Sequence, residues 1–291
     1  MDSQQLKAFL AVAEHGSFSV ASEHLFLTQS AVSKRIQSLE QQLDTQLFER
    51  HNRSVSLTES GQMLLPKARS ILQLMDDTQL QISNISGTVM GQLAMATSHH
   101  IGLHRLPPYL KEFAKRYPQA RLDLQFLGSE DAYDAVIERR VELALTTLDD
   151  QQPDEVEAYG LWDDQLFPVA AIDHPLTHKT NIKVAELAEW PAILPERDTI
   201  TYRLVEQAMH HAGSQLQTRM PTNYLETIKM MVSVGLGWSV LPPSMIDEQL
   251  VKLDCQLPSL HRRLGIIRLK SRPRSNAANA MIGLLQRRRD I

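Results

Sequence analysis

The chain has 291 residues, of which 43% are apolar and 22% charged, so it has the size and composition of a globular protein with room for two domains. No stretch approaches the roughly 18 uninterrupted apolar residues that a membrane span needs, and residues 1–5 are polar, unlike a secretion signal. The single cysteine, Cys255, excludes an intramolecular disulfide and any multi-cysteine metal site. We therefore expect a cytoplasmic protein without membrane contact.

The net charge of −4 argues against a protein that coats nucleic acid nonspecifically, since such proteins usually carry a large basic excess. Residues 1–58 also contain acidic as well as basic side chains. A DNA-binding interpretation must therefore depend on where the charges lie rather than on how many there are.

Three short helices are predicted in the first 45 residues. Apolar residues recur at helical spacing over 6–13, Gly16 ends that helix, and Ser17 can cap a second over 18–25. Thr28 can cap a third, whose apolar face is Val32, Ile36, Leu39 and Leu43. Its other positions carry short polar or basic side chains: Gln29, Ser30, Ser33, Lys34, Gln37 and Gln41. Two helices joined by a tight turn, the second polar at its start, form the geometry that reads the major groove.

Residues 47–58 follow as two alternating runs around a polar tip, which predicts a β-hairpin wing. We expect Gln29, Ser30, Ser33 and Lys34 to face base edges, and Arg35, Arg50 and Arg53 to hold phosphates or groove edges. The simpler alternative is that the polar residues of the third helix only face solvent. The ordered succession of capped helices and a basic hairpin favours DNA binding.

Residues 1–61 resemble the LysR-type transcriptional regulators. The matching residues are Leu6-Lys7-Ala8-Phe9, Gly16-Ser17-Phe18, Ala21, Leu25, Thr28-Gln29, Ala31-Val32-Ser33, Ile36, Leu39-Glu40, Leu43, Leu47-Phe48-Glu49-Arg50, Arg53 and Leu57-Thr58-Glu59-Ser60-Gly61. The chain departs from the family's common residues at Ser22, Ser30 and Asp44, which bears on operator preference rather than on the module.

One long helix is predicted from Glu59 to about Ser86, before Gly87. Apolar positions alternate spacings of four and three, as in a coiled-coil seam: Leu64, Ala68, Ile71, Met75, Ile82 and Ile85, with Thr78 between them. We expect this seam to form a homodimer, as the family resemblance also implies, and the dimer to supply the two-fold symmetry of paired half-sites. The alternative is that the stripe packs on its own domain.

After residues 87–91 the pattern changes to strands alternating with helices. Strands are predicted at 91–97, 121–127, 141–147, 167–172, 191–194, 238–241 and 265–269, and helices at 103–116, 129–139, 202–211, 224–234 and 277–288. This alternation predicts an α/β domain with helices on both faces of its sheets. Such domains bind ligands where strands lead into helices, and these junctions are rich in hydroxyl and amide groups. Helix capping alone is the competing explanation for those residues.

Residues 142–145 and 231–242 extend the resemblance, which implies a periplasmic-binding-protein-like domain of two lobes around an effector cleft. The implied architecture is a winged helix-turn-helix over 1–58, a linker helix over 59–87, and an effector-binding domain over 91–291. Lobe I would comprise 91–162 and 265–291, and lobe II 163–264. The positions that match cleft-lining residues are Ser98, His99, His100, Gly128, Thr146, Thr201 and Asn223.

Rival functions have weaker support. The chain lacks a phosphate-binding glycine loop, a nucleophile elbow and a His-Glu-x-x-His helix, so we expect no enzyme. His100 and His104 stand four residues apart, and His99, His210 or His211 could join them, but no carboxylate accompanies them at ligand spacing, so no metal is expected. Residues 287–289 are all arginine, which could indicate a second nucleic-acid-binding patch. We prefer the simpler explanation that basic side chains are favourable in the last turn of a helix. A purely architectural DNA protein would not need the large C-terminal domain.

The sequence thus predicts a homodimer that reads an interrupted inverted repeat in double-stranded DNA, and the family resemblance implies that such dimers pair again into a tetramer. No cofactor is expected. A small anionic metabolite, such as a carboxylate, would bind between the lobes and shift the population between two assemblies, with RNA polymerase as a candidate partner.

Overall fold

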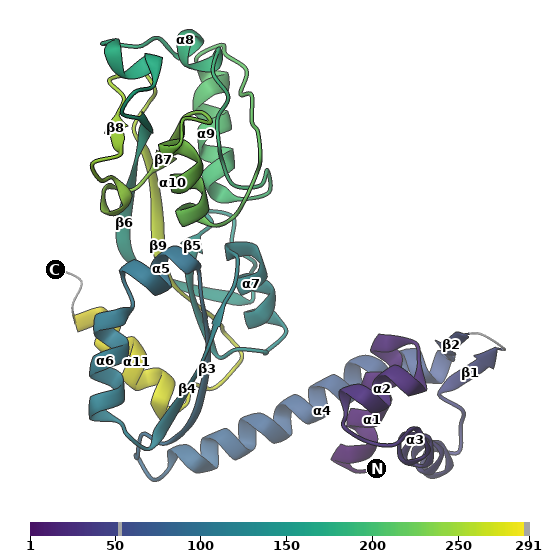
Figure 1. Ribbon diagram of the computed structural model, residues 1–291. Helices are drawn as coiled ribbons and strands as arrows, with labels where there is room; N and C mark the ends of the chain where they lie inside the picture. Colours follow the sequence, from purple (N-terminus) through teal and green to yellow (C-terminus); the bar gives the residue numbers. More distant parts are fainter. Residues whose placement is uncertain (52–53, 288–291) are drawn as a thin grey trace. The chain divides into compact units, whose positions relative to one another are not determined.

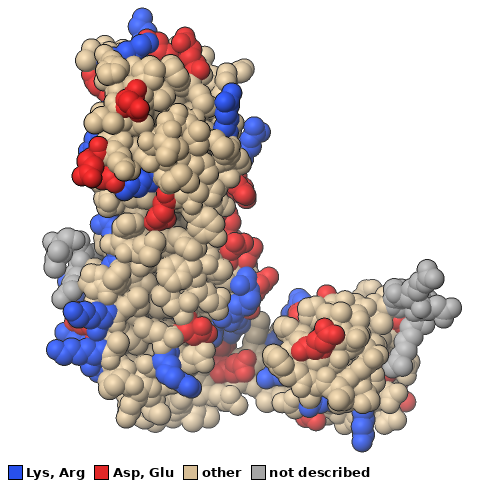
Figure 2. Space-filling view, viewed as in Figure 1, with Lys and Arg blue, Asp and Glu red and all other residues tan. Residues whose placement is uncertain are grey.

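A computed structural model describes residues 1–51 and 54–287 of the chain, which divides into two compact units, Met1–Ile85 and Ser86–Ile291. Figure 1 shows the elements of both units, and each unit has its own hydrophobic core. On the visible surface, acidic and basic side chains are interspersed in both units (Figure 2). Within the described part of the chain, none of the helices combines the length and apolar composition needed to cross a bilayer.

The first unit begins with the predicted three helices, α1 (Ser3–His15), α2 (Phe18–His24) and α3 (Gln29–Leu43). Both predicted N-caps are confirmed: the Ser17 hydroxyl accepts a hydrogen bond from the Val20 backbone N–H, and Thr28 accepts one from Ala31. Gly16 ends α1 in the left-handed conformation, with φ of 60°. The apolar faces of the three helices meet in one core: Leu6, Phe9, Val12, Phe18, Val32, Ile36 and Leu39.

The wing consists of β1 (Phe48–His51) and β2 (Ser54–Leu57), paired antiparallel. The buried carboxylate of Glu40 fixes where the wing begins, because its Oε1 accepts hydrogen bonds from the backbone N–H groups of Leu47 at 2.8 Å and Phe48 at 3.4 Å. The Phe9 and Phe48 rings pack with centroids 5.4 Å apart. The hairpin is therefore held against the helical module by hydrogen bonds to the Glu40 carboxylate and by the packing of Phe48 in the core.

The long helix α4 spans Glu59–Asn84, beginning at the cap formed by Thr58 and ending slightly before the predicted boundary. Its predicted apolar seam divides into two parts. Ala68 is fully buried in the core of its own module, and Leu64 and Ile71 pack beside it. Met75, Ile82 and Ile85 are exposed by 42%, 62% and 83%. The first half of the seam thus packs on its own domain, which was the alternative to dimerisation. The second half is exposed to solvent.

The second unit is built on a mixed sheet in the order β4-β3-β5-β9-β6-β7, with β8 also paired to β6. The parallel pairs are β3 with β4 and with β5, and the remaining pairs are antiparallel. The strands are β3 (Gly91–Thr97), β4 (Ala120–Phe126), β5 (Leu143–Leu148), β6 (Val156–Ala171), β7 (Ser239–Leu241), β8 (Leu250–Lys252) and β9 (Leu260–Leu269).

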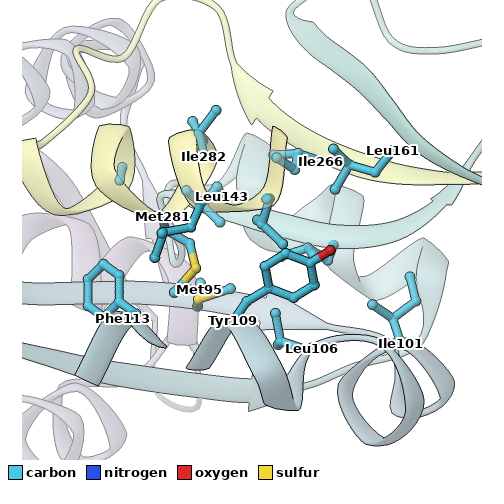
Figure 3. Packing of buried hydrophobic residues seen from close by; sticks show 14 of the residues in the cluster. Met95, Ile101, Leu106, Tyr109, Phe113, Leu143, Leu161, Ile266, Met281 and Ile282 are labelled. Carbon is cyan, nitrogen blue, oxygen red and sulfur yellow. The ribbon is translucent and has the colours of Figure 1, made fainter. Parts of the chain in front are cut away.

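Helices cover both faces of this sheet, which confirms the predicted α/β class (Figure 1). In lobe I, α6 (Pro107–Arg116) and α11 (Asn276–Arg287) pack with Met95, Leu143 and Ile266 in one core (Figure 3). The neighbouring residues Ala96, Ala144 and Ile267 point to the opposite face and pack with α7 (Ser129–Ile137). In lobe II, α8 (Val184–Ala188), α9 (Ile200–His211) and α10 (Leu225–Ser233) pack around β6 and β7. Short 3₁₀ turns lie at Pro175–His178 and Pro243–Met245.

The two lobes are joined by β6 and β9, which pass through both (Figure 1). These strands pair antiparallel from Val156 opposite Leu269 to Leu166 opposite Leu260, with an irregularity between Gly160 and Trp162. A Cβ atom at Gly265 would lie 2.2 Å from the Tyr159 carbonyl oxygen, so this crossing requires glycine.

Three predicted elements differ from those observed. Residues 103–116 were expected as one helix, but the structure has α5 (His99–His104) and then α6, because Pro107 and Pro108 begin a new helix. Residues 191–194 form only isolated bridges at Ala192, since Pro191 lacks an N–H group to extend the pairing. The strand expected at 167–172 is the end of the longer strand β6, which continues through both lobes.

Candidate functional site

The recognition helix α3 presents its polar residues much as predicted. Gln29, Ser30 and Lys34 are exposed, and Ser33 is half-buried. The Ser30 hydroxyl lies 3.1 Å from that of Thr28, at the start of the helix. Arg35 is half-buried and its Nη1 donates to Oε1 of Gln4 at 3.1 Å, so this guanidinium is oriented by α1. The first two turns therefore offer donors and acceptors on one surface.

The predicted basic residues of the wing lie partly outside the described residues. Arg53 lies outside the described residues, and so does the side chain of Arg50, although its backbone pairs with Val55. In the turn before α3, Phe26 has a left-handed backbone with φ of 53° and is 96% exposed. Such exposure of a large aromatic side chain beside the recognition helix was not predicted.

A cavity of about 410 Å³ lies between the two lobes of the second unit, where strands lead into helices. Its lining includes six of the seven predicted effector residues: Ser98, His99, His100, Gly128, Thr201 and Asn223. The exception is Thr146, which is fully buried and is absent from the lining, whereas its neighbour Thr147 is present. Successive residues of a strand point to opposite faces, so Thr147 rather than Thr146 faces the cavity.

Besides the short helix α5, three helices begin at this cavity: α7 after Gly128, α9 after Thr199, and α10 after Tyr224. Neither Gly128 nor Tyr224 contributes a side-chain cap hydrogen bond, and at the start of α7 the Glu130 carboxylate accepts a hydrogen bond from its own backbone N–H. Thr199 behaves differently, because its hydroxyl accepts from the Tyr202 N–H at 3.2 Å. Ser98 precedes α5 but makes no side-chain cap hydrogen bond. Helix N-termini carry partial positive charge, which favours an anion here.

A buried ion pair supports one wall of the cavity. Arg262 of β9 lines the cavity and donates from Nε to Oδ2 of Asp164 at 2.9 Å, and its Nη1 donates to the Thr201 hydroxyl at 3.0 Å. Asp164 also accepts from Arg105 at 3.4 Å. Thr201 therefore serves to orient Arg262 as well as to line the cavity. Sequence reasoning missed this network because the residues of the ion pair are 98 positions apart.

The cavity also has an acidic part, formed by Glu130, Asp131 and Glu196. Burial raises the pKa of Glu130, and the nearby carboxylates of Asp198 and Asp131 add to that increase. Asn223 Oδ1 accepts from the Glu196 backbone N–H at 3.0 Å, which leaves its amide nitrogen to donate to a ligand. The lining is thus able to recognise hydroxyl or ammonium groups as well as an anion.

Aromatic rings from both lobes meet at His99. Its ring lies 5.2 Å from that of Phe126 and 4.5 Å from that of Tyr224, in an edge-to-face arrangement with the latter. All three residues line the cavity. His99 therefore contacts residues that precede α7 and α10.

The two remaining histidines of α5 form a separate cluster. His100 is 4% exposed, and burial, followed by the Arg262 charge, lowers its pKa to about 3, so its ring is neutral at neutral pH. Its ring lies 5.1 Å from that of His104. His104 Nε2 is 3.2 Å from Oε1 of Glu226, which belongs to α10. The sequence has no carboxylate at ligand spacing from this histidine pair, but the fold brings one to it from 122 residues away.

A winged helix-turn-helix in one unit, and a two-lobed α/β domain with an interlobe cavity in the other, define a class: DNA-binding regulators that respond to a small molecule.

Comparison with known proteins gives the family. Residues 86–290 match the model described as "LysR substrate binding domain", and residues 3–62 match "Bacterial regulatory helix-turn-helix protein, lysR family". The chain belongs to the LysR family of transcriptional regulators, which are DNA-binding regulators rather than enzymes.

Individual relatives agree with this assignment. An uncharacterised HTH-type transcriptional regulator of Azotobacter vinelandii is 60% identical over 108 residues, covering 37% of this chain and 75% of the relative. The structure of full-length CbnR complexed with its target DNA has a TM-score of 0.63 at 19% identity, covering 99% of both chains. The effector-binding domain of QuiR in complex with shikimate has a TM-score of 0.61 at 19% identity, covering 68% of this chain and 96% of that one.

Proposed function

We propose that this LysR-family regulator binds a small hydroxylated or amino-substituted carboxylate in its interlobe cavity and thereby controls how a homodimer engages DNA. The observation that carries the proposal is the meeting of three helix N-termini with the acidic residues Glu130, Asp131 and Glu196 around one cavity. The helix ends favour a carboxylate, and the acidic groups favour hydroxyl or ammonium hydrogens. A volume of about 410 Å³ suits a small metabolite.

Within the cavity, we assign the carboxylate to the region of Ser98, Asn223 and the start of α9. Ser98 offers a hydroxyl that is not used for capping, and Asn223 offers an amide nitrogen. Arg262 adds positive charge from the wall, although Asp164 balances most of it. The neighbour QuiR was solved with shikimate, a hydroxylated carboxylate, which supports the proposal.

For DNA, we propose that Gln29, Ser30, Ser33 and Lys34 read base edges, while Arg35, Arg50 and Arg53 hold phosphates or groove edges. The exposure of Gln29, Ser30 and Lys34 at the start of α3 supports this assignment. Two copies of the module would read the halves of an interrupted inverted repeat, and RNA polymerase is the partner through which promoter output would change.

The dimer, in this proposal, forms through the exposed half of α4, where Met75, Ile82 and Ile85 continue the coiled-coil spacing. A helix that leaves these side chains open to water gains stability by pairing with a second copy. Effector-domain contacts would pair dimers into a tetramer. We propose that residues 1–58, 59–87 and 91–291 are the functional parts of the chain, with the lobes divided near residues 163 and 264.

The DNA proposal is tested by selecting an operator from random double-stranded DNA and then measuring affinities for it. Gln29→Ala should weaken operator binding by about 1–3 kcal/mol and leave binding to random DNA nearly unchanged. Gln41→Ala is the matched control, since Gln41 is an exposed glutamine near the other end of α3. Equal losses on operator and random DNA would contradict base reading by Gln29.

The effector proposal is tested by a thermal-shift screen of the full chain against hydroxy acids, amino acids, and the matching alcohols and amines without a carboxylate. Stabilisation confined to the carboxylates supports the proposal. Stabilisation by the alcohols or amines alone contradicts it.

A further inference from the structure

We propose that His100, His104 and Glu226 form a binding site for a divalent transition-metal ion that joins α5 of lobe I to α10 of lobe II. One ligand atom from each of these residues lies within 4.8 Å of the other two. They come from two elements far apart in the sequence, so their convergence is a property of the fold.

His100 is the first reason to infer a ligand. Its side chain is 4% exposed, and neither ring nitrogen has a hydrogen-bond partner among the residues that the structure describes. Buried polar atoms in native proteins are nearly always paired, so a ring with two unpaired nitrogens indicates a missing partner. A metal ion bound to one nitrogen would supply that partner.

The composition and spacing of the cluster are the second reason. His100 and His104 are separated by one helical turn, which places both rings on the same face of α5. Glu226 adds a carboxylate oxygen, already 3.2 Å from Nε2 of His104. Two imidazoles and one carboxylate are the protein ligands of many zinc sites that keep a fourth position for water. This donor set also suits cobalt and nickel and does not suit calcium, which prefers oxygen ligands.

The neighbouring charges permit a cation at this position. Arg105 and Arg262 are close to His100, but both contact the buried carboxylate of Asp164. Glu226 brings a second negative charge from α10. The two acidic residues therefore offset the two arginines before a metal ion is added.

A metal ion at this position would draw the two lobes together. Ligand atoms around a tetrahedral zinc ion are separated by roughly 3.3 Å, as follows from bonds of about 2.0–2.1 Å, so the cluster must contract from its present span. Contraction moves α10 toward α5. The adjacent residues Ser98, His99, Tyr224 and Leu225 line the interlobe cavity, so metal binding would also close its wall. The metal site does not depend on the identity of the effector or on DNA binding.

The test uses the untagged full-length chain, freed of metal by a chelator and titrated with Co²⁺, whose visible absorption reports coordination by nitrogen and oxygen ligands. We expect one Co²⁺ ion per chain, displaced by Zn²⁺. His104→Ala and Glu226→Gln should each weaken Co²⁺ binding by at least about tenfold, since each removes a ligand. Both side chains are partly exposed, at 33% and 37%, so the variants should fold, and thermal unfolding verifies this.

His210→Ala with His211→Ala is the matched control, because it removes two neighbouring exposed histidines from the end of α9. The proposal requires this variant to bind Co²⁺ as the unmodified chain does. It is overturned if the control loses the absorption band, or if His104→Ala and Glu226→Gln both keep their affinity. Because no effector or DNA is present, either outcome is independent of the proposed function.

Discussion

Asp164 and Arg262 face each other across β6 and β9, and Nε and Nη2 of the arginine lie 2.9 and 2.8 Å from the same carboxylate oxygen. Their side chains are 1% and 6% exposed. The pair lies on the two strands that connect the lobes, beside the interlobe cavity. A buried contact at this position links the stability of the domain to the orientation of the cavity wall.

Asp164→Ala should therefore lower the free energy of unfolding by about 3–5 kcal/mol, because it leaves Arg262 buried without its counter-charge. Urea unfolding of the full chain measures the change. Asp150→Ala is the control, since Asp150 pairs with Arg263 at a site where the two side chains are 90% and 58% exposed, and its loss should cost less than about 1 kcal/mol. Similar losses of unfolding free energy in the two variants would contradict the expectation that the buried pair contributes more to stability than the exposed pair.

Ser98 and Thr199 should respond differently to truncation. Ser98→Ala should weaken stabilisation by a carboxylate effector while leaving the free energy of unfolding within about 0.5 kcal/mol, because the hydroxyl makes no cap hydrogen bond. Thr199→Ala should cost about 1 kcal/mol, because it removes the cap of α9. Thermal unfolding with and without the effector separates the two. A loss of DNA binding in Ser98→Ala would contradict its assignment to the effector.

Acid should destabilise the effector-binding domain through His100. The folded-state pKa is about 3, below the ordinary value of 6.5, so between these pH values the unfolded chain binds more protons. Stability from this residue is complete above pH 6.5 and is lost as the pH falls toward 3, by about 1.4 kcal/mol per unit within the interval. Denaturation at several pH values, in chelator, should give a shallower pH dependence for His100→Asn than for the unmodified chain. Equal slopes would contradict a neutral buried imidazole.

Dimerisation should depend on the distal half of α4. Ile82→Glu places a charge on the exposed apolar seam and should weaken self-association at least tenfold, or about 1.4 kcal/mol. Gln81→Glu introduces the same charge at the adjacent exposed position and should have little effect. Sedimentation equilibrium measures both. An unchanged dimer in Ile82→Glu would locate the interface elsewhere.

The sequence predicted well those features that depend on neighbouring residues. Ser17 and Thr28 cap helices because a hydroxyl reaches a backbone N–H only three residues ahead. The strand-to-helix junctions likewise led to Ser98, Gly128 and Asn223 on the cavity lining. Ser98 and Gly128 follow β3 and β4, whose carboxyl ends lie at the edge of the sheet, and the family resemblance singled out these two residues and Asn223.

Features that depend on tertiary geometry were not predictable in the same way. Thr146 and Thr147 differ in which face of β5 they point to, and both faces of that strand are buried, so hydrophobic alternation gives no signal. Glu226 and the Asp164–Arg262 pair meet partners that only the folded sheet brings near. The seam of α4 illustrates the same limit, because its spacing does not reveal that Ala68 packs on its own module.

That division of α4 has a geometrical consequence for a dimer. Since Leu64, Ala68 and Ile71 fix the helix to the DNA-binding module, the module and the exposed half of α4 belong to one body. The crossing angle between two such helices would then set the separation of the two recognition helices. Operators with differently spaced half-sites would be accommodated by a change in that angle, and the tolerated spacing would report on how stiffly the two helices pack.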